Sequence, residues 1–137
     1  MYNILAKEKI AQDTYRMRLE APCIAEERQP GQFIILSVHG EYGERIPLTI
    51  VDSDSGEGSI TVIFQVVGYS TQELAKLETG DALPVLLGPL GHPTHVEKFG
   101  HVVCVGGGIG VAPLYPIVKA LCDEGNTITS IIGARTK

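Results

Sequence analysis

The most distinctive chemistry in the sequence is a glycine-rich stretch at residues 104–114, which reads CVGGGIGVAPL. Apolar residues precede the glycines and a helical pattern follows them, so the stretch predicts a strand, a loop and a helix. Glycines let the backbone approach a ligand closely, and a helix N-terminus attracts a pyrophosphate. The candidate contacts are Gly106, Gly107, Gly108 and Gly110. A tight turn without a ligand also explains them, and the pattern G-x-G-x-x-G fits imperfectly because Pro113 takes the third glycine position.

A second candidate site lies at residues 43–50, which read GERIPLTI. Arg45 offers a planar fork of hydrogen-bond donors to a phosphate. The hydroxyl of Thr49 could bond a ring nitrogen, and Pro47 and Leu48 offer apolar surface to a flat ring. An ordinary strand with a surface arginine explains the same residues, so this segment gains meaning only from its context.

A third candidate lies at residues 68–71 (GYST), at the expected start of a helix. Ser70 and Glu73 have the Ser-x-x-Glu spacing of a capping box, and we expect the helix to stop near Gly80. The same helix start can bind an anion, because a cap satisfies only some of its free N–H groups. Residues 88–91 (GPLG) indicate only a turn.

No set of side chains suggests a general base, a nucleophile or a metal site, so we nominate no catalytic residue and no metal ligand. The four histidines have no ligand-like spacing to Cys, Asp or Glu, and we expect them on the surface or in loops: His39, His92, His95 and His101. The three cysteines match no zinc or iron–sulfur pattern: Cys23, Cys104 and Cys122.

The elements that would position these candidates are short strands in residues 1–99. We expect strands at 2–10, 14–20, 33–38, 46–51, 59–67 and 81–87, separated by turn signals. This pattern predicts a small antiparallel β-barrel of the Greek-key type with one helix. Apolar residues on both faces of the strand at 59–67 predict that it is buried on much of both sides.

Residues 100–137 predict a different arrangement, a single β-α-β unit. Its strands are expected at 101–105 and 127–132, and its helix at 112–124. One face of the helix carries four apolar residues at helical spacing, Leu114, Ile117, Val118 and Leu121. Doubly wound nucleotide-binding domains have five or six strands. We therefore expect a barrel domain at 1–99, followed at 100–137 by the incomplete start of an α/β nucleotide-binding domain.

Composition sets the class of protein. The 137 residues are 44% hydrophobic and 20% charged, which is typical of a folded domain. The net charge of −5 and the scattered basic residues argue against nucleic-acid binding. No apolar run approaches the roughly 20 residues of a membrane span. Three cysteines without a secretory signal indicate reduced thiols, and we expect a cytoplasmic location.

Five motifs in this order resemble the ferredoxin–NADP reductase superfamily. They are PGQF at 30–33, RIPLTI at 45–50, QVVG at 65–68, GPLG at 88–91 and GGGIGVAPL at 106–114. Within the superfamily the chain is most similar to electron-transfer flavoprotein subunits. GERIPLTI at 43–50 and IIGARTK at 131–137 favour the small subunit of NADH-dependent reduced ferredoxin:NADP oxidoreductase, also called sulfide dehydrogenase, over the related electron-transfer subunit of dihydroorotate dehydrogenase.

The resemblance implies an FAD-binding barrel followed by an NAD(P)-binding domain. By position in the motifs, the FAD contacts would be Arg45, Pro47, Leu48, Thr49, Val66, Val67, Gly68, Ser70 and Thr71. Thr49 would lie near flavin N5, and the four glycines at 106, 107, 108 and 110 would hold the nicotinamide dinucleotide. The sequence departs from plant-type reductases in two places: Leu48 replaces a stacking tyrosine, and Arg45 lies four residues before Thr49 instead of three.

The activity that the resemblance implies is electron transfer between NAD(P)H and iron–sulfur centres through FAD, in an oxidoreductase subunit. The expected partners are a larger iron–sulfur and flavin subunit and ferredoxin. The family's full-length subunit also carries a two-iron two-sulfur cluster, whose ligands are absent from these 137 residues. Two alternatives stay open: the dihydroorotate dehydrogenase subunit, and a truncated module that binds flavin or a partner without turnover.

The choice between NAD and NADP also stays open. Arg135 follows the expected second strand of the nucleotide-binding part, and an arginine there favours NADP in Rossmann domains. The relatives implied by the resemblance use NAD.

Overall fold

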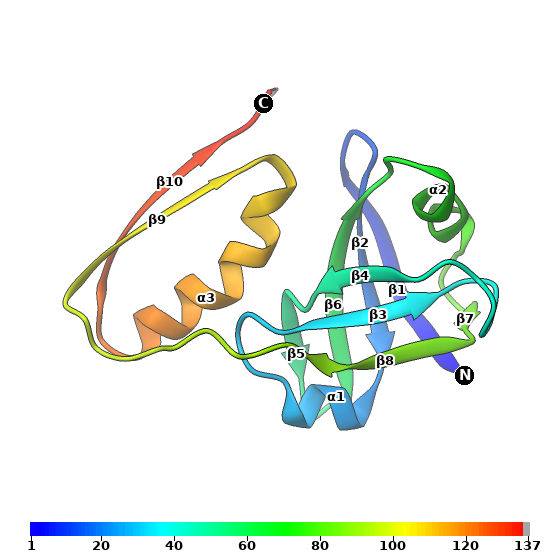
Figure 1. Ribbon diagram of the computed structural model, residues 1–137, viewed down its shortest axis with the longest axis horizontal. Helices are drawn as coiled ribbons and strands as arrows, with labels where there is room; N and C mark the ends of the chain where they lie inside the picture. The colour runs from blue at the N-terminus through cyan, green and yellow to red at the C-terminus, as the bar shows by residue number, and fades with distance from the viewer. Residues whose placement is uncertain (136–137) are drawn as a thin grey trace.

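The computed structural model describes residues 1–135. Thr136 and Lys137, the end of the IIGARTK motif, lie outside the described residues. Figure 1 shows two parts, a larger one built mainly of strands and a smaller one with two strands and a long helix, joined by an extended segment.

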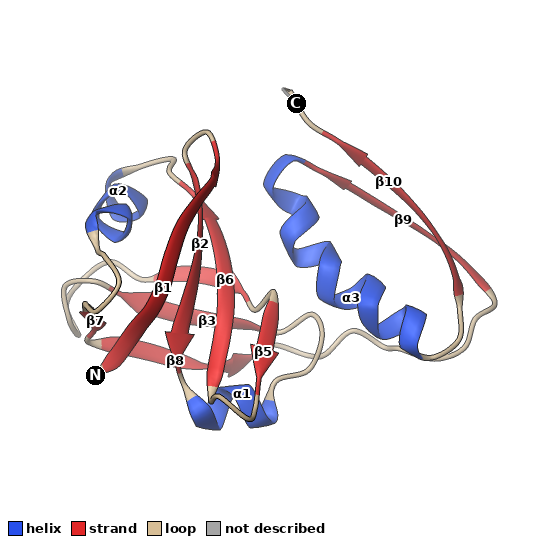
Figure 2. Ribbon diagram, turned by 180° about the vertical axis from the view of Figure 1, so that it is seen from behind, coloured by secondary structure: helices blue, strands red, loops and turns tan. Residues whose placement is uncertain are grey.

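The larger part contains β1 (Tyr2–Ala11), β2 (Thr14–Glu20), α1 (Pro22–Glu27), β3 (Phe33–Ser37), β4 (Ile46–Thr49), β5 (Asp52–Asp54), β6 (Ser59–Gln65), α2 (Tyr69–Lys76), β7 (Ala82–Leu83) and β8 (Val85–Leu90). Its strands form two sheets, in the orders β5-β6-β2-β1-β7 and β4-β3-β8. Every pairing within them is antiparallel, and the two sheets cross one another in Figures 1 and 2. The predicted antiparallel barrel is thereby confirmed.

The apolar side chains of the two sheets meet in one core. Phe64 on β6 lies opposite Tyr15 on β2, and the two rings stack with centroids 5.7 Å apart. The largest fully buried side chains around them come from both sheets and from α2: Ile4, Met17, Leu19, Ile34, Leu36, Ile50, Ile60, Leu74 and Leu83. Burial of this much apolar surface is the main force that holds the barrel together.

Strand β6 is fully buried along one face and partly buried along the other. Ile60, Val62 and Phe64 point into the core, whereas Ile63 is half-buried and Gln65 is exposed. The expectation that this strand is buried on much of both sides therefore holds only in part, because the outer face is buried at Ser59, half-buried at Ile63 and exposed at Gln65. The sequence separates the two faces only weakly, because Ile63 on the outer face is as apolar as its neighbours on the inner face.

Helix α1 is a second helix in a part of the chain for which the sequence predicted one. Pro22 starts it, where a missing N–H costs nothing, and Ile24 and Ala25 pack into the core. Six residues are too few to show a helical period in the sequence. The expected strand at 81–87 is also divided, into β7 and β8, because Pro84 between them has no N–H to donate.

The motifs PGQF and GPLG lie together and hold the segment that leads out of the barrel. The side-chain amide of Gln32 donates to the carbonyl oxygen of Gly91 at 3.0 Å, and the N–H of Thr94 donates to the carbonyl oxygen of Pro30 at 2.9 Å. Gly91 has φ +85°, and a Cβ there would lie 2.9 Å from a ring carbon of Phe33. Both motifs therefore have a structural role, which is to set the path of the chain after β8.

The smaller part is β9 (His101–Gly107), a single 3₁₀ turn η1 (Gly108–Gly110), α3 (Val111–Asp123) and β10 (Thr127–Gly133). The two strands are parallel, with Cys104 opposite Ser130, and α3 packs against them. The side chain of Asn126 links the segment before β9 to the end of α3. Its oxygen accepts hydrogen bonds from the N–H groups of Phe99 and Gly100, and its nitrogen donates to the carbonyl oxygens of Glu97 and Leu121. The predicted β-α-β unit is confirmed.

The face of this unit that lies away from α3 is open. Val105 is 69% exposed, and Val103 and Ile131, on the same face, are also more than half exposed. No helix within residues 1–135 is long and apolar enough to cross a membrane.

Candidate functional site

Strand β4 presents one face to the core and the other to solvent. Ile46 is buried and Leu48 is half-buried against the core, so the alternation of side chains places Pro47 and Thr49 on the outer face. Arg45 comes directly before the strand and is exposed, and none of the ion pairs within residues 1–135 includes it. Arg45, Pro47 and Thr49 are thus available to a ligand. Leu48, which the sequence placed among the flavin contacts, packs mainly toward the core.

The start of α2 is a second group of candidate residues. Gly68 is the N-cap, with an extended backbone that any residue could adopt, and a Cβ built on it would meet nothing within 4 Å. The N–H groups of Tyr69, Ser70 and Thr71 form the first turn, where a helix leaves N–H groups without internal partners. The space beside Gly68 and these donors suit an anionic ligand.

The cap of α2 differs from the predicted one. The hydroxyl of Thr71 accepts hydrogen bonds from the N–H groups of Val67 at 2.9 Å and Gly68 at 3.1 Å. Glu73, which the sequence placed in a capping box with Ser70, bonds Lys76 instead. The helix begins two residues earlier than that box requires and ends at Lys76 rather than near Gly80. Gly68 is thus the N-cap by position, and the side chain of Thr71 supplies the capping hydrogen bonds. The Thr71 hydroxyl is therefore already hydrogen-bonded within the chain.

Loss of the Thr71 hydroxyl should destabilise this end of the barrel. We expect Thr71→Val to lower the free energy of unfolding by about 0.5–2 kcal/mol, because two N–H groups lose their acceptor. Urea unfolding followed by far-ultraviolet circular dichroism measures the change. Thr71→Ser should restore most of the stability, and Thr79→Val, at an exposed loop position, should leave it unchanged. A Thr71→Val protein as stable as the parent would contradict the capping role.

The two groups on the barrel lie next to one another. The hydroxyl of Ser70 hydrogen-bonds a carboxylate oxygen of Glu44, the residue before Arg45. His39, in the same loop between β3 and β4, lies 3.6 Å from a carboxylate oxygen of Glu73. The structure thus brings the segment at 45–49 to the start of α2, although 20 residues separate them in the sequence.

Glu73 and Lys76 shift the pKa of one another. The hydrogen bond from Lys76 is the main cause that lowers the pKa of Glu73, and the same bond raises the pKa of Lys76. Because the folded-state pKa of Glu73 is below its unfolded value, this pairing stabilises α2 above the unfolded pKa and is lost as pH falls through the folded one. Lys76 is exposed and the Glu73 side chain is half-buried. The pair helps to hold α2, and we assign it no role in chemistry. All four histidines are exposed, as expected.

The glycines of the loop after β9 differ in what the fold demands of them. A Cβ on Gly106 would lie 2.9 Å from Cδ2 of Leu114, so this glycine lets α3 pack closely on β9. Gly108 has φ +56°, a conformation that side chains disfavour. Gly110 has φ −64°, and a Cβ there would meet nothing within 4 Å. Packing explains Gly106 and backbone geometry explains Gly108, but neither explains Gly110, which keeps space open at the start of α3.

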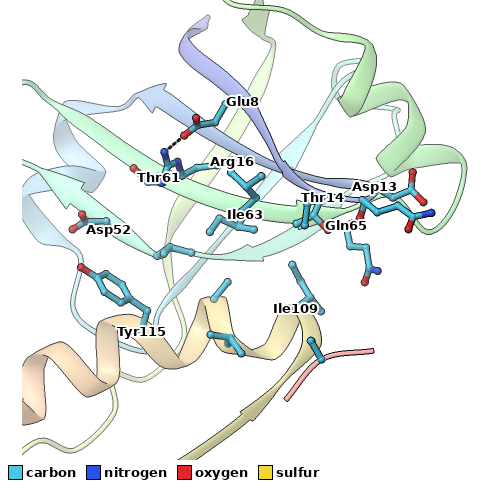
Figure 3. Close-up of a pocket in the computed structure, with 18 of the residues that line it drawn as sticks. Glu8, Asp13, Thr14, Arg16, Asp52, Thr61, Ile63, Gln65, Ile109 and Tyr115 are labelled. Atoms are coloured by element: carbon cyan, nitrogen blue, oxygen red, sulfur yellow. Dashed lines mark hydrogen bonds and ion pairs between the residues drawn. The ribbon is translucent and has the colours of Figure 1, made fainter. Parts of the chain in front are cut away.

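A groove of about 1510 Å³ separates the outer face of β1, β2 and β6 from the glycine loop and α3. Gly107 and Gly108 line it, and the other predicted site residues do not. In Figure 3, Ile109 faces the side of β6 that carries Gln65, and Tyr115 extends from α3 toward Asp52. Asp52 pairs with Arg28 of the barrel at 3.5 Å, and Lys119 of α3 lies 4.0 Å from the same carboxylate, across the groove.

Sequence reasoning missed the barrel side of this groove. Its residues come from the outer faces of ordinary strands and form no motif: Lys7, Glu8, Arg16, Thr61, Ile63 and Gln65. Only one signal could have found them, the polar alternation of β2 and β6, which marks a solvent-facing side but not a binding site. The predicted site residues therefore form two separate groups, one on the barrel at 45–49 and 68–71 and one in the glycine loop of the β-α-β unit, where η1 contacts β6.

Comparison with known proteins places this geometry in context. No protein-family model matches the chain. It is 46% identical, over 98% of its length and 47% of the relative, to a dihydroorotate dehydrogenase B (NAD(+)) electron transfer subunit homolog of Thermotoga maritima. Among solved structures it superposes with a TM-score of 0.96 on an NADH-dependent reduced ferredoxin–NADP oxidoreductase, at 45% identity over 100% of this chain and 49% of that one.

Over its whole length the chain is similar to members of the ferredoxin–NADP reductase superfamily, as the five motifs predicted. A cytochrome P450 reductase from Amycolatopsis also superposes on it, with a TM-score of 0.81 and 25% identity over 98% of this chain and 43% of the other. Because the chain spans about half the length of the relatives that it matches, their complete activities and partners do not transfer directly to this chain.

Proposed function

We propose that this chain is the flavin-binding part of an electron-transfer subunit of an oxidoreductase, which moves electrons between a nicotinamide nucleotide and iron–sulfur centres. The observation that carries the proposal is the TM-score of 0.96, at 45% identity over the whole chain, with an NADH-dependent reduced ferredoxin–NADP oxidoreductase. We assign residues 1–99 to FAD binding and residues 100–137 to the start of NAD(P) binding. The larger iron–sulfur and flavin subunit and ferredoxin remain the proposed partners.

The hydrogen-bond donors of Arg45 and of the start of α2 fit the phosphate groups of FAD. The guanidinium of Arg45 and the N–H groups at the start of α2 would bind the phosphates, and the space beside Gly68 would admit them. Pro47 would pack on the ring system and the hydroxyl of Thr49 would hydrogen-bond it. The chemistry that bound FAD would supply is to accept a hydride from the nicotinamide and to release its electrons one at a time. The residues of the chain bind and orient, and none is assigned a proton-transfer role.

Absorbance of the purified chain tests this proposal. We expect it to bind FAD and to show a flavin spectrum that bleaches when NADH or NADPH is added, and the faster of the two identifies the preferred nucleotide. A flavin spectrum that does not bleach would support a binding module without turnover. A protein that stays colourless and takes up no added FAD would overturn the proposal.

The second candidate function is electron transfer for a dihydroorotate dehydrogenase. The 46% identity to the Thermotoga maritima protein favours it. If this alternative holds, dihydroorotate should reduce the flavin of the chain only when a dihydroorotate dehydrogenase catalytic subunit is present. Reduction of the flavin by NADPH or by reduced ferredoxin, in the absence of dihydroorotate, would instead support the first function.

The Thr49 hydroxyl gives a residue-level test of the flavin site. We expect Thr49→Val to weaken FAD binding by about 0.5–1.5 kcal/mol or to shift the flavin potential, because the change removes one hydrogen bond and keeps the shape. Isothermal titration and a redox titration measure the two quantities. Thr61→Val, the same change on the outer face of β6, should alter neither. Unchanged affinity and potential in Thr49→Val would count against the assignment.

A further inference from the structure

The segment between β8 and β9 is bonded to the barrel at its start. The N–H of Thr94 donates to the carbonyl oxygen of Pro30 at 2.9 Å. A Cβ on Gly31 would clash with the hydroxyl oxygen of Thr94, so the segment also packs tightly on the turn before β3. Thr94 is therefore the last residue of the segment that the barrel holds in place.

The end of the same segment is bonded to the β-α-β unit. The side-chain nitrogen of Asn126 donates to the carbonyl oxygen of Glu97 at 2.9 Å. The side-chain oxygen of Asn126 accepts from the N–H groups of Phe99 at 2.6 Å and Gly100 at 2.9 Å. Asn126 is only 7% exposed, so water competes little for these bonds. Glu97 is therefore the first residue of the segment that the unit holds in place.

His95 and Val96 lie between these two anchors. Within residues 1–135, no hydrogen bond involves the backbone N–H or carbonyl oxygen of either residue. The His95 ring lies toward the unit, with Nε2 3.3 Å from a carboxylate oxygen of Glu97 and the ring edge-on to Phe99. Rotation about the backbone at residues 95–96 breaks no backbone hydrogen bond, as a hinge requires.

The two parts that this segment joins have separate cores. The buried core of the barrel contains no residue after Leu86 in the described part of the chain, whereas Cys104 and Leu121 are buried in the unit. Direct contact between the parts centres on η1 and β6. The groove of about 1510 Å³ lies on one side of α3, and a second groove of about 550 Å³ lies between the end of α3 and the turn before β3. Parts of a chain that lack a large apolar interface are expected to move relative to one another.

One ion pair crosses the larger groove. Nζ of Lys119 on α3 lies 4.0 Å from the carboxylate of Asp52 on β5, and none of the other ion pairs within residues 1–135 joins the barrel to the unit. Arg28 holds Asp52 on the barrel side, at 3.5 Å. Lys119 is exposed, so it can leave Asp52 without uncovering a buried charge.

We infer that the β-α-β unit turns as one body about residues 95–96, and that the ion pair between Asp52 and Lys119 holds the groove in its narrow arrangement. Gly107 and Gly108 line the wall of the groove that moves. The motion therefore changes the space between the glycine loop and the outer face of β6. The inference goes beyond the proposed function, because the motion requires neither FAD nor NAD(P).

Two native cysteines can carry probes for this motion. Cys23 on α1 and Cys122 on α3 are exposed, one in each part, whereas Cys104 is buried. Nitroxide labels on the two exposed thiols report the distance between the parts by double electron–electron resonance. We expect the 137-residue chain to show a main distance with a tail toward longer ones. Singly labelled Cys23→Ser and Cys122→Ser chains measure any signal that comes from association of copies.

Lys119→Glu tests the ion pair. It places two negative charges across the groove, so we expect a longer mean distance and a wider distribution than in the parent. The parent should change in the same direction in about 1 M salt, because the pair is exposed and is screened. Lys98→Glu, the same charge reversal at an exposed position without an ion pair to the barrel, should leave the distribution unchanged.

Val96→Gly tests the position of the hinge. Glycine widens the range of backbone angles at residue 96, so the distribution should become wider. Pro93→Gly, in the part of the segment that the barrel holds, should have no such effect. Circular dichroism spectra equal to that of the parent verify that each variant is folded.

The outcomes separate the two elements of the inference. A single narrow distance that Lys119→Glu, salt and Val96→Gly all leave unchanged would overturn it. A response to Val96→Gly without any response to Lys119→Glu or salt would support the hinge and overturn the role of the ion pair. Equal widening by Val96→Gly and Pro93→Gly would overturn the assignment of the hinge to residues 95–96. None of these results depends on cofactor binding, so the inference and the proposed function can fail separately.

Discussion

Replacement of Gly110 by valine should weaken NAD(P)H binding by roughly 100-fold, or about 2.7 kcal/mol, and leave FAD binding unchanged. The backbone at Gly110 has φ −64° and ψ −14°, which every residue adopts readily, and nothing lies within 4 Å of the position of a Cβ. Valine there should leave the fold intact and fill the space at the start of α3 that we assign to the pyrophosphate. Titration of nucleotide fluorescence and of FAD fluorescence measures the two affinities.

The other glycines of the loop are controls with different outcomes. Gly106→Ala should destabilise the β-α-β unit, because its Cβ would lie 2.9 Å from Leu114. Gly108→Val should also lose the nucleotide, but strain at φ +56° contributes to that loss. Gly56→Val, in an exposed turn of the barrel, should change neither affinity. Loss of FAD together with the nucleotide in Gly110→Val would contradict two separate sites, and unchanged nucleotide affinity would contradict the assignment of the loop.

Truncation of Phe64 should have the largest effect on stability. Phe64 is 1% exposed and stacks on Tyr15 in the centre of the barrel. We expect Phe64→Ala to lower the free energy of unfolding by about 3–5 kcal/mol, through lost apolar burial and a residual cavity. Urea unfolding followed by circular dichroism measures the change, with Leu87→Ala as the matched control.

Leu87 is 46% exposed on β8, so its truncation should cost about 1 kcal/mol or less. FAD affinity of Phe64→Ala adds a second readout, because β6 leads directly into residues 66–71 at the proposed site. A loss of stability as small as that of Leu87→Ala would mean that β6 is not the centre of the core.

Local patterns in the sequence were sufficient to predict most of the strands and the longest helix. β2 and β3 alternate or run apolar between turn signals, and α3 shows a helical period between Pro113 and Gly125, so their positions could be predicted to within a residue or two. The order of the five motifs was also sufficient for the superfamily. The exceptions are short or divided elements: α1 has no detectable period, and Pro84 divides a strand that the apolar pattern presented as one.

The residues that could bind a ligand could be predicted only in part from the sequence. The glycine loop and the segment at 45–49 could be singled out because their residue types are chemically unusual. The direction of Leu48 could not, because it depends on the pairing of β4 with β3, which turns Leu48 toward the core and Thr49 away from it. The cap at Thr71 was likewise misassigned to Ser70, because both residues have hydroxyls and only the backbone of α2 decides which one reaches the free N–H groups.

The sequence by itself determined the antiparallel barrel, the β-α-β unit and the motifs that indicate FAD and NAD(P), because each depends on neighbours in the chain. Three features follow only from the tertiary structure. Glu44 hydrogen-bonds Ser70, the PGQF and GPLG motifs hydrogen-bond one another, and one face of β6 borders a groove. These features join residues between 20 and 60 positions apart. Their contacts are set by how sheets and helices pack, and no local pattern of residue types specifies that packing.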